Sequence, residues 1–494
     1  MKISLKMSSQ IARLKELIEV ARGVEKADVV LKKAEIVNVV TEEIYTADIA
    51  FCKDLIAGIG RYEGIKEIDA KGLYAVPGLI DGHMHIEMSM LSVSEFAKLV
   101  VPRGTTAVVA DPHEIANVLG KDGIKLILEE AKHTPLRVFC LVPSCVPSSP
   151  LETSGAKIDV KDVEELLSLD GVIGLAEVMN FLGVITCDEE VLLKILASKG
   201  KIVDGHCPKL SGKDLNAYVA SGIMSDHEST ELEEAKEKLR LGMRIMIREG
   251  SAARNLTALK ELAGNRYTML VTDGDRDVID LINEGYLDYV FRRAIEEGVD
   301  EIKALQMLTI NPAEYFGINA GVIAPGKLAD VILLNNLRKF DVARVFIGGA
   351  DPIFKRFEYP EFAKNTVKAR KINLDDIRTG SGKARIIEVF DGEIITGQSI
   401  EEVNGISTEK DILKAVVVER HTNSGRVGKA FVRGFGIKKG AIAQSIAHDA
   451  HNIVAVGASD EEICAAVNRV IDLQGGIVVV DGNDFTELQL RIAG

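Results

Sequence analysis

Between Tyr74 and Val271 the chain alternates short apolar segments with amphipathic segments, and this alternation limits the folds that it can adopt. The apolar segments have the length of buried strands, and helical spacing follows them at 94–101, 161–169, 189–198 and 230–241. The expected strands are 75–81, 105–111, 136–143, 172–178, 201–205, 222–225, 243–247 and 267–271. This pattern predicts an α/β fold, a (β/α)8 TIM barrel. A doubly wound open sheet is the alternative, but no glycine-rich dinucleotide motif follows the first strand.

Polar residues of a restricted kind follow the carboxyl ends of these expected strands. They are His83, His85, Asp111, His113, Glu177, His206, His227 and Asp273, and they include five of the nine histidines. In a TIM barrel these strand ends meet at one face, where catalytic side chains lie. Each residue alone has an ordinary explanation, such as a cap or a buried core histidine. Their occurrence at successive strand ends favours one shared site.

The pair His83 and His85 is the clearest sign of a metal site. In a strand, residues i and i+2 point to the same side, so both imidazoles can converge on one ion. Asp273, after the last strand, can complete that ion's ligands. His206 and His227 can hold a second ion.

Glu177 comes from the end of the fourth strand, between these two groups, and can bridge both ions. A pair of divalent ions lowers the pKa of bound water from about 15.7 towards about 7, which provides a hydroxide nucleophile. Asp273 can then act as general base and afterwards as general acid. Asp275 is the alternative for this position.

Composition excludes several classes of protein. With 494 residues, of which 47% are hydrophobic, the chain is globular and long enough for several domains. Its net charge is −14, and without a basic cluster we expect no nucleic-acid or membrane partner. Six scattered cysteines and the lack of an apolar run of about 18 residues favour a cytoplasmic protein.

The segments on either side of the barrel predict additional domains. Short alternating strands before residue 74 and after residue 320 favour a small β-sandwich built from both sides of the barrel. The expected divisions are an N-terminal helix with the first part of the β-sandwich at 1–73, the barrel at 74–320, the return strands of the sandwich at 321–354, a linker at 355–383 and a C-terminal α+β domain at 384–494.

Longer motifs extend along the chain: PGLIDGHMH at 77–85, HIEMSM at 85–90, ADPHEIANVLG at 110–120, AEVMNF at 176–181, SDHE at 225–228, MIREGSAARNL at 246–256, the run at 311–313, 321–323 and 326–330, and the whole of 423–452. These motifs resemble the amidohydrolase superfamily, and within it the adenine deaminases. The resemblance covers nearly the whole chain. It implies hydrolytic deamination of adenine, a small-molecule substrate, to hypoxanthine and ammonia in purine salvage. It also implies a metal-bridged hydroxide at two divalent ions, manganese or iron, with zinc as the alternative.

The family's site residues can be transferred to this chain position by position. Its metal ligands correspond to the six positions deduced from the strand ends: His83, His85, Glu177, His206, His227 and Asp273. Glu228 joins Glu177 and Asp273 as a candidate catalytic residue. The candidates for adenine binding are Glu87, Ser89, Asp111, His113 and Glu114. Each of these five has an alternative role in orienting the ligating imidazoles, and Asp111 with His113 could hold a further ion.

Several other features have a structural interpretation. We expect 231–240 to be a charged helix face and Arg248 to pair with Glu249. His448 and His451 are three residues apart, so they could form a metal pair, or instead belong to a face that is solvated or that covers the barrel mouth. We expect a homo-oligomer.

Two other functions remain open. A cyclic amide hydrolase, such as a dihydroorotase or hydantoinase, commonly bridges its metals with a modified lysine, whereas Glu177 stands here. A non-catalytic barrel scaffold would lack ligands, and all six are present.

Overall fold

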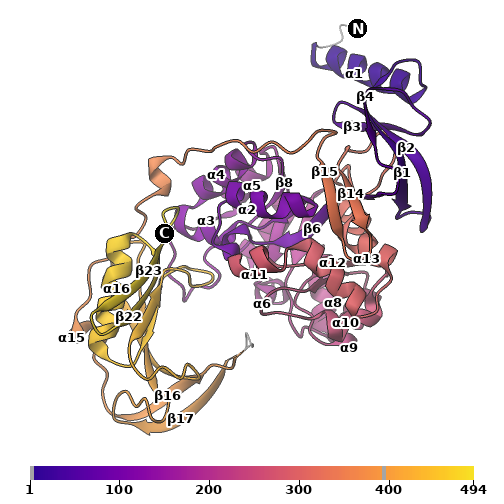
Figure 1. Cartoon of the computed structure of the whole chain (residues 1–494). Coiled ribbons are helices and arrows are strands. Elements are labelled where there is room, and N and C mark those ends of the chain that lie inside the picture. Colours follow the sequence, from indigo (N-terminus) through magenta and orange to yellow (C-terminus); the bar gives the residue numbers. More distant parts are fainter. Residues whose placement is uncertain (1–4, 392–395) are drawn as a thin grey trace.

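The computed structural model describes residues 5–391 and 396–494, and a curled parallel sheet lies at its centre (Figure 1). The strands are β6 (Leu79–Met84), β7 (Thr105–Ala110), β8 (Arg137–Val142), β9 (Val172–Val178), β10 (Ile202–Gly205), β11 (Ser225–Asp226), β12 (Arg244–Arg248) and β13 (Thr268–Val271). They pair in the orders β10-β9-β8-β7-β6 and β11-β12-β13. Because β10 lies beside β11 and β13 lies beside β6, the two sheets form one ring. The prediction of a TIM-barrel-like domain is confirmed.

Helices surround this ring and bury their apolar faces against it. They are α2 (Val93–Val100), α3 (His113–Leu119), α4 (Lys121–Ala131), α5 (Val160–Leu167), α6 (Phe181–Ile185), α7 (Glu189–Ala197), α8 (Gly212–Ala220), α9 (Leu232–Arg240), α10 (Leu256–Leu259), α11 (Val278–Asn283), α12 (Leu287–Glu296), α13 (Glu301–Leu308) and α14 (Ile310–Phe316). Short 3₁₀ turns lie at Ile86–Ser89, Val101–Arg103 and Lys260–Leu262. Aspartates start several helices: Asp188, for example, accepts a hydrogen bond from the Val191 amide at the start of α7. Ile80, Val109 and Met269 belong to the apolar cluster that fills the barrel interior.

The first expected strand, 75–81, is divided between two sheets. β5 (Tyr74–Pro77) pairs with β14 (Val331–Asn336) outside the barrel, whereas β6 begins at Leu79. Gly78 connects them where a side chain would not fit, because an added Cβ would lie 2.1 Å from the Thr106 hydroxyl oxygen. Residues 75–81 read as one strand in the sequence, so the change from one sheet to the other at Gly78 was not predicted.

The flanking domain is one mixed sheet of seven strands. Its other members are β1 (Ala27–Asn38), β2 (Glu43–Cys52), β3 (Leu55–Gly60), β4 (Gly64–Asp69) and β15 (Asp341–Phe346). The order is β15-β14-β5-β1-β2-β3, with β4 paired to β1, so strands from both sides of the barrel combine in it. Helix α1 (Leu5–Ala21) packs on this sheet through Leu17 and Val20 (Figure 1).

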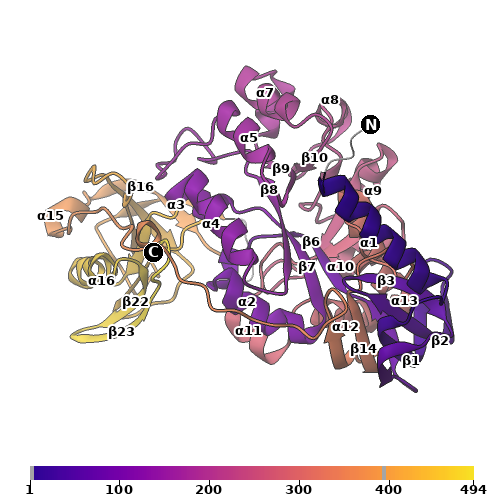
Figure 2. The same cartoon turned by 90° about the horizontal axis from the view of Figure 1, so that it is seen from above.

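The C-terminal domain lies beside α3 and α4, on the side of the barrel away from the flanking sheet (Figures 1 and 2). Its sheet has the order β17-β16-β19-β18-β21-β20-β22-β23. The strands are β16 (Gly382–Glu388), β17 (Gly397–Val403), β18 (Leu413–Val418), β19 (Val427–Arg433), β20 (Ala441–Gln444), β21 (Ile453–Gly457), β22 (Gly476–Asp481) and β23 (Asp484–Gln489). Helix α16 (Asp460–Leu473) covers β20, β21 and β22.

The expected linker at 355–383 contains a 3₁₀ turn (Glu361–Ala363) and a short helix, α15 (Leu374–Ile377). Val367, Ile372 and Ile377 pack into the core of the C-terminal domain. Across residues 5–391 and 396–494, none of the helices combines the length and hydropathy that crossing a membrane requires.

Candidate active site and metal centre

All six expected metal ligands lie at the carboxyl-terminal end of the barrel. His83 is in β6 and Glu177 is in β9. The histidines at 85, 206 and 227 directly follow β6, β10 and β11, and Asp273 lies two residues after β13. Five of them are buried, and His206 is half-buried. The strand ends bring these side chains together because parallel strands of a barrel end at a common face.

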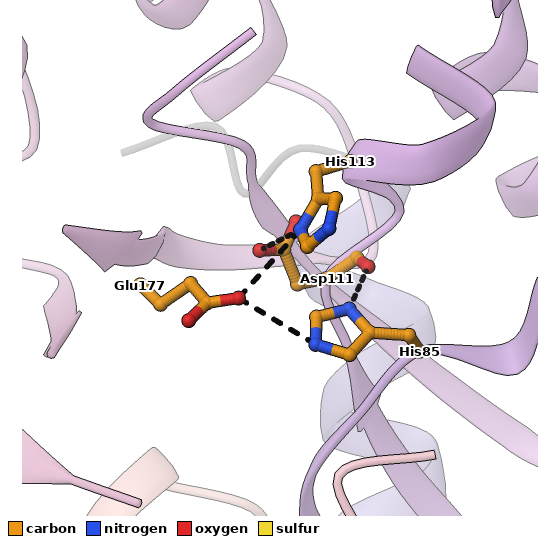
Figure 3. Close-up of side chains that lie close together, drawn as sticks. All are labelled: His85, Asp111, His113 and Glu177. Carbon is orange, nitrogen blue, oxygen red and sulfur yellow. Dashed lines mark hydrogen bonds and ion pairs between the residues drawn. The ribbon is translucent and has the colours of Figure 1, made fainter. Parts of the chain in front are cut away.

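The carboxylate of Glu177 faces histidines from several strands. One oxygen, Oε2, lies 2.6 Å from His206 Nδ1 and 3.2 Å from His227 Nε2. The other, Oε1, lies 3.5 Å from His85 Nε2 and 3.6 Å from His113 Nδ1 (Figure 3). Each oxygen therefore faces a different group of imidazoles, which is the arrangement that a bridging carboxylate needs.

Asp273 divides its two oxygens between the histidines and an arginine. Its Oδ1 atom lies 3.2 Å from His83 Nε2 and 3.3 Å from His85 Nε2, and its Oδ2 atom lies 2.9 Å from Arg248 Nη2. Burial raises the pKa of Asp273, but the Arg248 guanidinium and the two histidines outweigh it and hold the pKa well below its usual value. Asp275 instead accepts the backbone N–H groups of residues 252 and 253. Asp273 is thus the acid that faces the histidines.

These residues fit a metal centre in their chemistry and in their unused hydrogen-bonding capacity. His83 Nε2 and Asp273 Oδ1 are buried and find no hydrogen-bond partner among residues 5–391 and 396–494. Three groups each place their ligand atoms within 4.8 Å of one another: His83, His85 and Asp273; His83, Glu177 and His227; and His206, His227 and Glu228. Imidazole and carboxylate donors suit first-row divalent ions.

Neighbouring groups orient the two histidines of the first strand. His83 Nδ1 lies 2.7 Å from Asp204 Oδ2, and His85 Nδ1 donates to the carbonyl oxygen of Asp111 at 2.9 Å. Each hydrogen bond holds the proton on Nδ1 and leaves Nε2 free for a metal. Asp204 was not among the predicted site residues, although an aspartate inside the apolar strand β10 is a signal that could have identified it.

Asp111 and His113 lie next to the donors, as expected. Asp111 Oδ2 is 3.1 Å from His113 Nδ1, and Figure 3 shows both side chains converging with His85 and Glu177. Asp111 Oδ1 is buried and finds no hydrogen-bond partner in the described part of the chain. Glu228 lies 3.5 Å from His227 Nε2 through its Oε1 atom.

The other three expected adenine-binding residues make different contacts. Ser89 donates from its hydroxyl to the Ile86 carbonyl oxygen at 2.6 Å, within the 3₁₀ turn after β6. Glu87 accepts the Ile115 amide, and burial together with the Glu114 carboxylate raises the pKa of Glu87 to about 7. Glu87 and Glu114 border a cavity of about 360 Å³ between the barrel and the C-terminal domain. None of the six donors is among the described residues that line this cavity.

Arg248 does not form the expected pair with Glu249. Its guanidinium contacts Glu228 and Asp273, both beside the histidines. Glu249 pairs with Arg293 at 3.3 Å. The expectation was wrong because a residue at the end of a buried strand points to the side opposite its neighbour.

The expected charged helix face at 231–240 is part of α9, but Lys238 points into the protein. It is fully buried, and its ammonium contacts Asp226 at 2.9 Å and Glu234 at 2.7 Å. Asp226 also accepts hydrogen bonds from the Cys207 amide and the Ser229 hydroxyl. This network supports the segments that carry His206 and His227.

The C-terminal domain reaches the edge of this site. Asp449 Oδ1 lies 3.4 Å from His113 Nε2. Nothing in a single sequence pairs residue 449 with residue 113, so this contact could not be predicted.

Comparison with known proteins assigns the family. An amidohydrolase family model matches residues 74–350, and an adenine deaminase C-terminal domain model matches residues 393–494. The adenine deaminase of Archaeoglobus fulgidus is 68% identical over 99% of this chain and 87% of its own length. The chain belongs to the adenine deaminase family of amidohydrolases. A second adenine deaminase, from Dehalococcoides mccartyi, is 46% identical over 97% of this chain and 88% of its own.

Solved structures support the fold of this adenine deaminase family member. Atrazine chlorohydrolase from Arthrobacter aurescens, solved with zinc, is 15% identical with a TM-score of 0.52 over 66% of this chain and 95% of its own. N-acetyl-D-glucosamine-6-phosphate deacetylase from Mycobacterium smegmatis is 14% identical with a TM-score of 0.50 over 65% of this chain and 99% of its own. At this identity the likeness concerns the fold alone.

Proposed function

We propose that this chain catalyses the hydrolytic deamination of adenine to hypoxanthine and ammonia, a purine salvage reaction. The proposal is carried by the similarity to adenine deaminases, which extends over 99% of the chain and so includes the barrel and the C-terminal domain. The donor set at the barrel end supports it, since Glu177 occupies the position between the two groups of histidines.

Six residues would hold two divalent ions, manganese or iron, with zinc as the alternative: His83, His85, Glu177, His206, His227 and Asp273. When bound, such ions supply the Lewis acidity that lowers the pKa of water towards neutrality. Asp204 and the Asp111 carbonyl group keep the protons of His83 and His85 on Nδ1, so both Nε2 atoms stay available.

The chain's own carboxylates would move the protons. Asp273 takes a proton from the attacking water through Oδ1, while Arg248 holds its other oxygen. The oxygen of that water bonds to C6 of the purine, and Glu228, which enters this step as the neutral acid, gives its proton to the ring nitrogen beside C6. Asp273 then passes its proton to the amino group, the C6–N bond breaks and ammonia leaves. The hydroxyl proton on the C6 oxygen returns to Glu228, so hypoxanthine leaves as the neutral lactam. Arg248 contacts both carboxylates and fixes their relative position.

Among the five candidates for adenine binding, Asp111 and His113 lie nearest to the six donors. Both lie beside Glu177, and Asp111 Oδ1 is a buried acceptor that an amino group or a ring N–H of the substrate would satisfy. Glu87 would act from the neighbouring cavity, whereas the Glu114 carboxylate faces His448 and His451 of the C-terminal domain. Ser89 would act by holding the turn that carries Glu87.

Ammonia release from adenine tests this proposal. The protein is stripped with a chelator, loaded with Mn²⁺ or Fe²⁺ and given adenine or dihydroorotate, with the stripped protein as control. We expect ammonia and hypoxanthine from adenine only, and only after loading. Turnover of dihydroorotate without turnover of adenine would instead identify a cyclic amide hydrolase.

A further inference from the structure

A second cluster of metal-binding side chains lies where the C-terminal domain meets the barrel. Glu114 belongs to α3 of the barrel, whereas His448 and His451 belong to the segment between β20 and β21. Glu114 Oε1 lies 2.7 Å from His448 Nδ1, and Glu114 Oε2 lies 3.5 Å from His451 Nε2. One carboxylate from one domain thus faces two imidazoles from the other.

Two atoms of this cluster are buried without a partner. Glu114 Oε2 and His451 Nε2 find no hydrogen bond within residues 5–391 and 396–494, although both residues are more than nine-tenths buried. Leaving such a group buried and unsatisfied destabilises the fold. Each points at the other, so one cation between them would satisfy both.

The spacing of the donor atoms suits a small divalent ion. All three ligand atoms lie within 4.8 Å of one another. Donors about 2.1 Å from a tetrahedral ion are about 3.4 Å apart, close to the 3.5 Å between Glu114 Oε2 and His451 Nε2. Glu114 Oε1 and His448 Nδ1 are 2.7 Å apart, a hydrogen-bond distance, so the His448 side chain would have to move away slightly to bind the ion. Two imidazoles and one carboxylate form a donor set typical of first-row divalent metals.

We propose that Glu114, His448 and His451 bind a third divalent metal ion, which fastens the C-terminal domain to the barrel. The site shares no ligand with the six donors of the proposed catalytic centre, so it goes beyond the deamination reaction. His448 is 40% exposed, and Glu114 and His451 border the cavity of about 360 Å³, which leaves room for water as a further ligand.

The ion would also act on the neighbouring contact between the domains. Asp449 lies between the two histidines in the sequence and contacts His113 of the barrel. An ion on His448 and His451 would restrict this segment on both sides of Asp449. The third ion would therefore hold the C-terminal segment beside the proposed adenine-binding residues.

Metal stoichiometry tests the proposal on the full chain. Stripped protein is dialysed against Zn²⁺, and bound zinc is measured by elemental analysis. We expect three ions per chain for the wild type. We expect two ions per chain for each of the single variants His448→Gln and His451→Gln. The matched control is His133→Gln, because His133 is a histidine outside both clusters, and it should retain three ions.

Two ions in the wild type, or three in both variants, would overturn the proposal. If His451→Gln does not fold, as judged by circular dichroism, the wild type and His448→Gln decide the result, since His448 is partly exposed. Ammonia release from adenine is measured separately. A chain that binds three ions without deaminating adenine would refute the proposed function and leave this site standing.

Discussion

Asp273 shows how the surroundings of one residue select its role. Its Oδ1 atom faces His83 and His85, while Oδ2 is held by Arg248. One oxygen can therefore serve as ligand and proton carrier while the other keeps the side chain in place. This division distinguishes Asp273 from Asp275, whose carboxylate accepts two backbone amides.

Replacing Asp273 with Asn should separate proton transfer from metal binding. The amide keeps one oxygen for an ion but cannot carry the proton, a function typically worth roughly 10²–10⁴-fold in rate, or about 3–5 kcal/mol. We expect kcat for ammonia release to fall by this factor with the metal content largely kept. A near-normal kcat would indicate that Asp275, and not Asp273, carries the proton.

Arg248 acts through the two carboxylates that it holds. Arg248→Met should lower kcat about 10–100-fold, because a charge-assisted hydrogen bond is worth about 1.5–3 kcal/mol. Arg248→Lys should recover part of the rate, since it restores the charge without the planar fork. Steady-state kinetics of both variants check this. Equal rates for Met and Lys would show that the charge of residue 248 has no role.

At the scale of single elements, helix α9 is held in place by a buried ion pair between Lys238 and Asp226. The charged sequence of the helix does not indicate that this lysine is buried. Lys238→Met should destabilise the fold by about 3–5 kcal/mol, because Asp226 would remain buried without its cation. Denaturant unfolding of chelator-treated protein measures the change. Lys236→Met, on the same helix but partly exposed, should change stability by about 0.5 kcal/mol or less. Equal effects of the two substitutions would refute the role of the buried pair.

The turn between β18 and β19 depends on a single carboxylate. Burial raises the pKa of Glu419, but hydrogen bonds from Ser424 and from the amides of Thr422 and His421 outweigh it and lower the pKa to about 2. Because the folded pKa lies below the ordinary value of 4.5, this stabilisation is present above pH 4.5 and lost as the pH falls towards 2.

The stability difference between wild type and Glu419→Gln should therefore be largest above pH 4.5 and shrink towards pH 2. Denaturant unfolding of both chelator-treated proteins at several pH values gives this difference directly. A difference that does not change with pH would contradict the assignment.

Local patterns predicted the barrel elements, but pairings between distant segments could not be predicted. The strand β9 has the expected bounds, since apolar runs and turn residues report local structure. The division at Gly78 depends on its packing against Thr106, and the burial of Lys238, in helix α9, depends on Asp226 in strand β11. Such contacts are properties of the assembled fold.

The same limit applies to the site. The convergence of these six side chains could be predicted because each lies at or just after the end of a strand in a repeated pattern, and a barrel brings strand ends together. Arg248, Asp204 and Asp449 were missed because their roles depend on which side chain lies opposite. Charged residues of this kind are common in any sequence, so their position alone carries little information.

At the scale of the whole molecule, the barrel carries the proposed chemistry and two other domains flank it. The mixed sheet of the flanking domain joins both sides of the barrel through β5 and β14. The C-terminal domain contributes Asp449 beside His113, and its segment at 448–451 also faces Glu114. The site at the barrel end is thus bordered by residues from two domains.

The central claim is that Glu177 joins two metal ions at which adenine is deaminated. The direct measurement is bound metal and ammonia release on the same samples of wild type and Glu177→Gln, loaded with Mn²⁺ and dialysed. Because the amide lacks the negative charge that a bridging ligand provides, we expect the variant to lose at least one bound ion and its activity together. Unchanged metal content with an unchanged rate of ammonia release would contradict the claim.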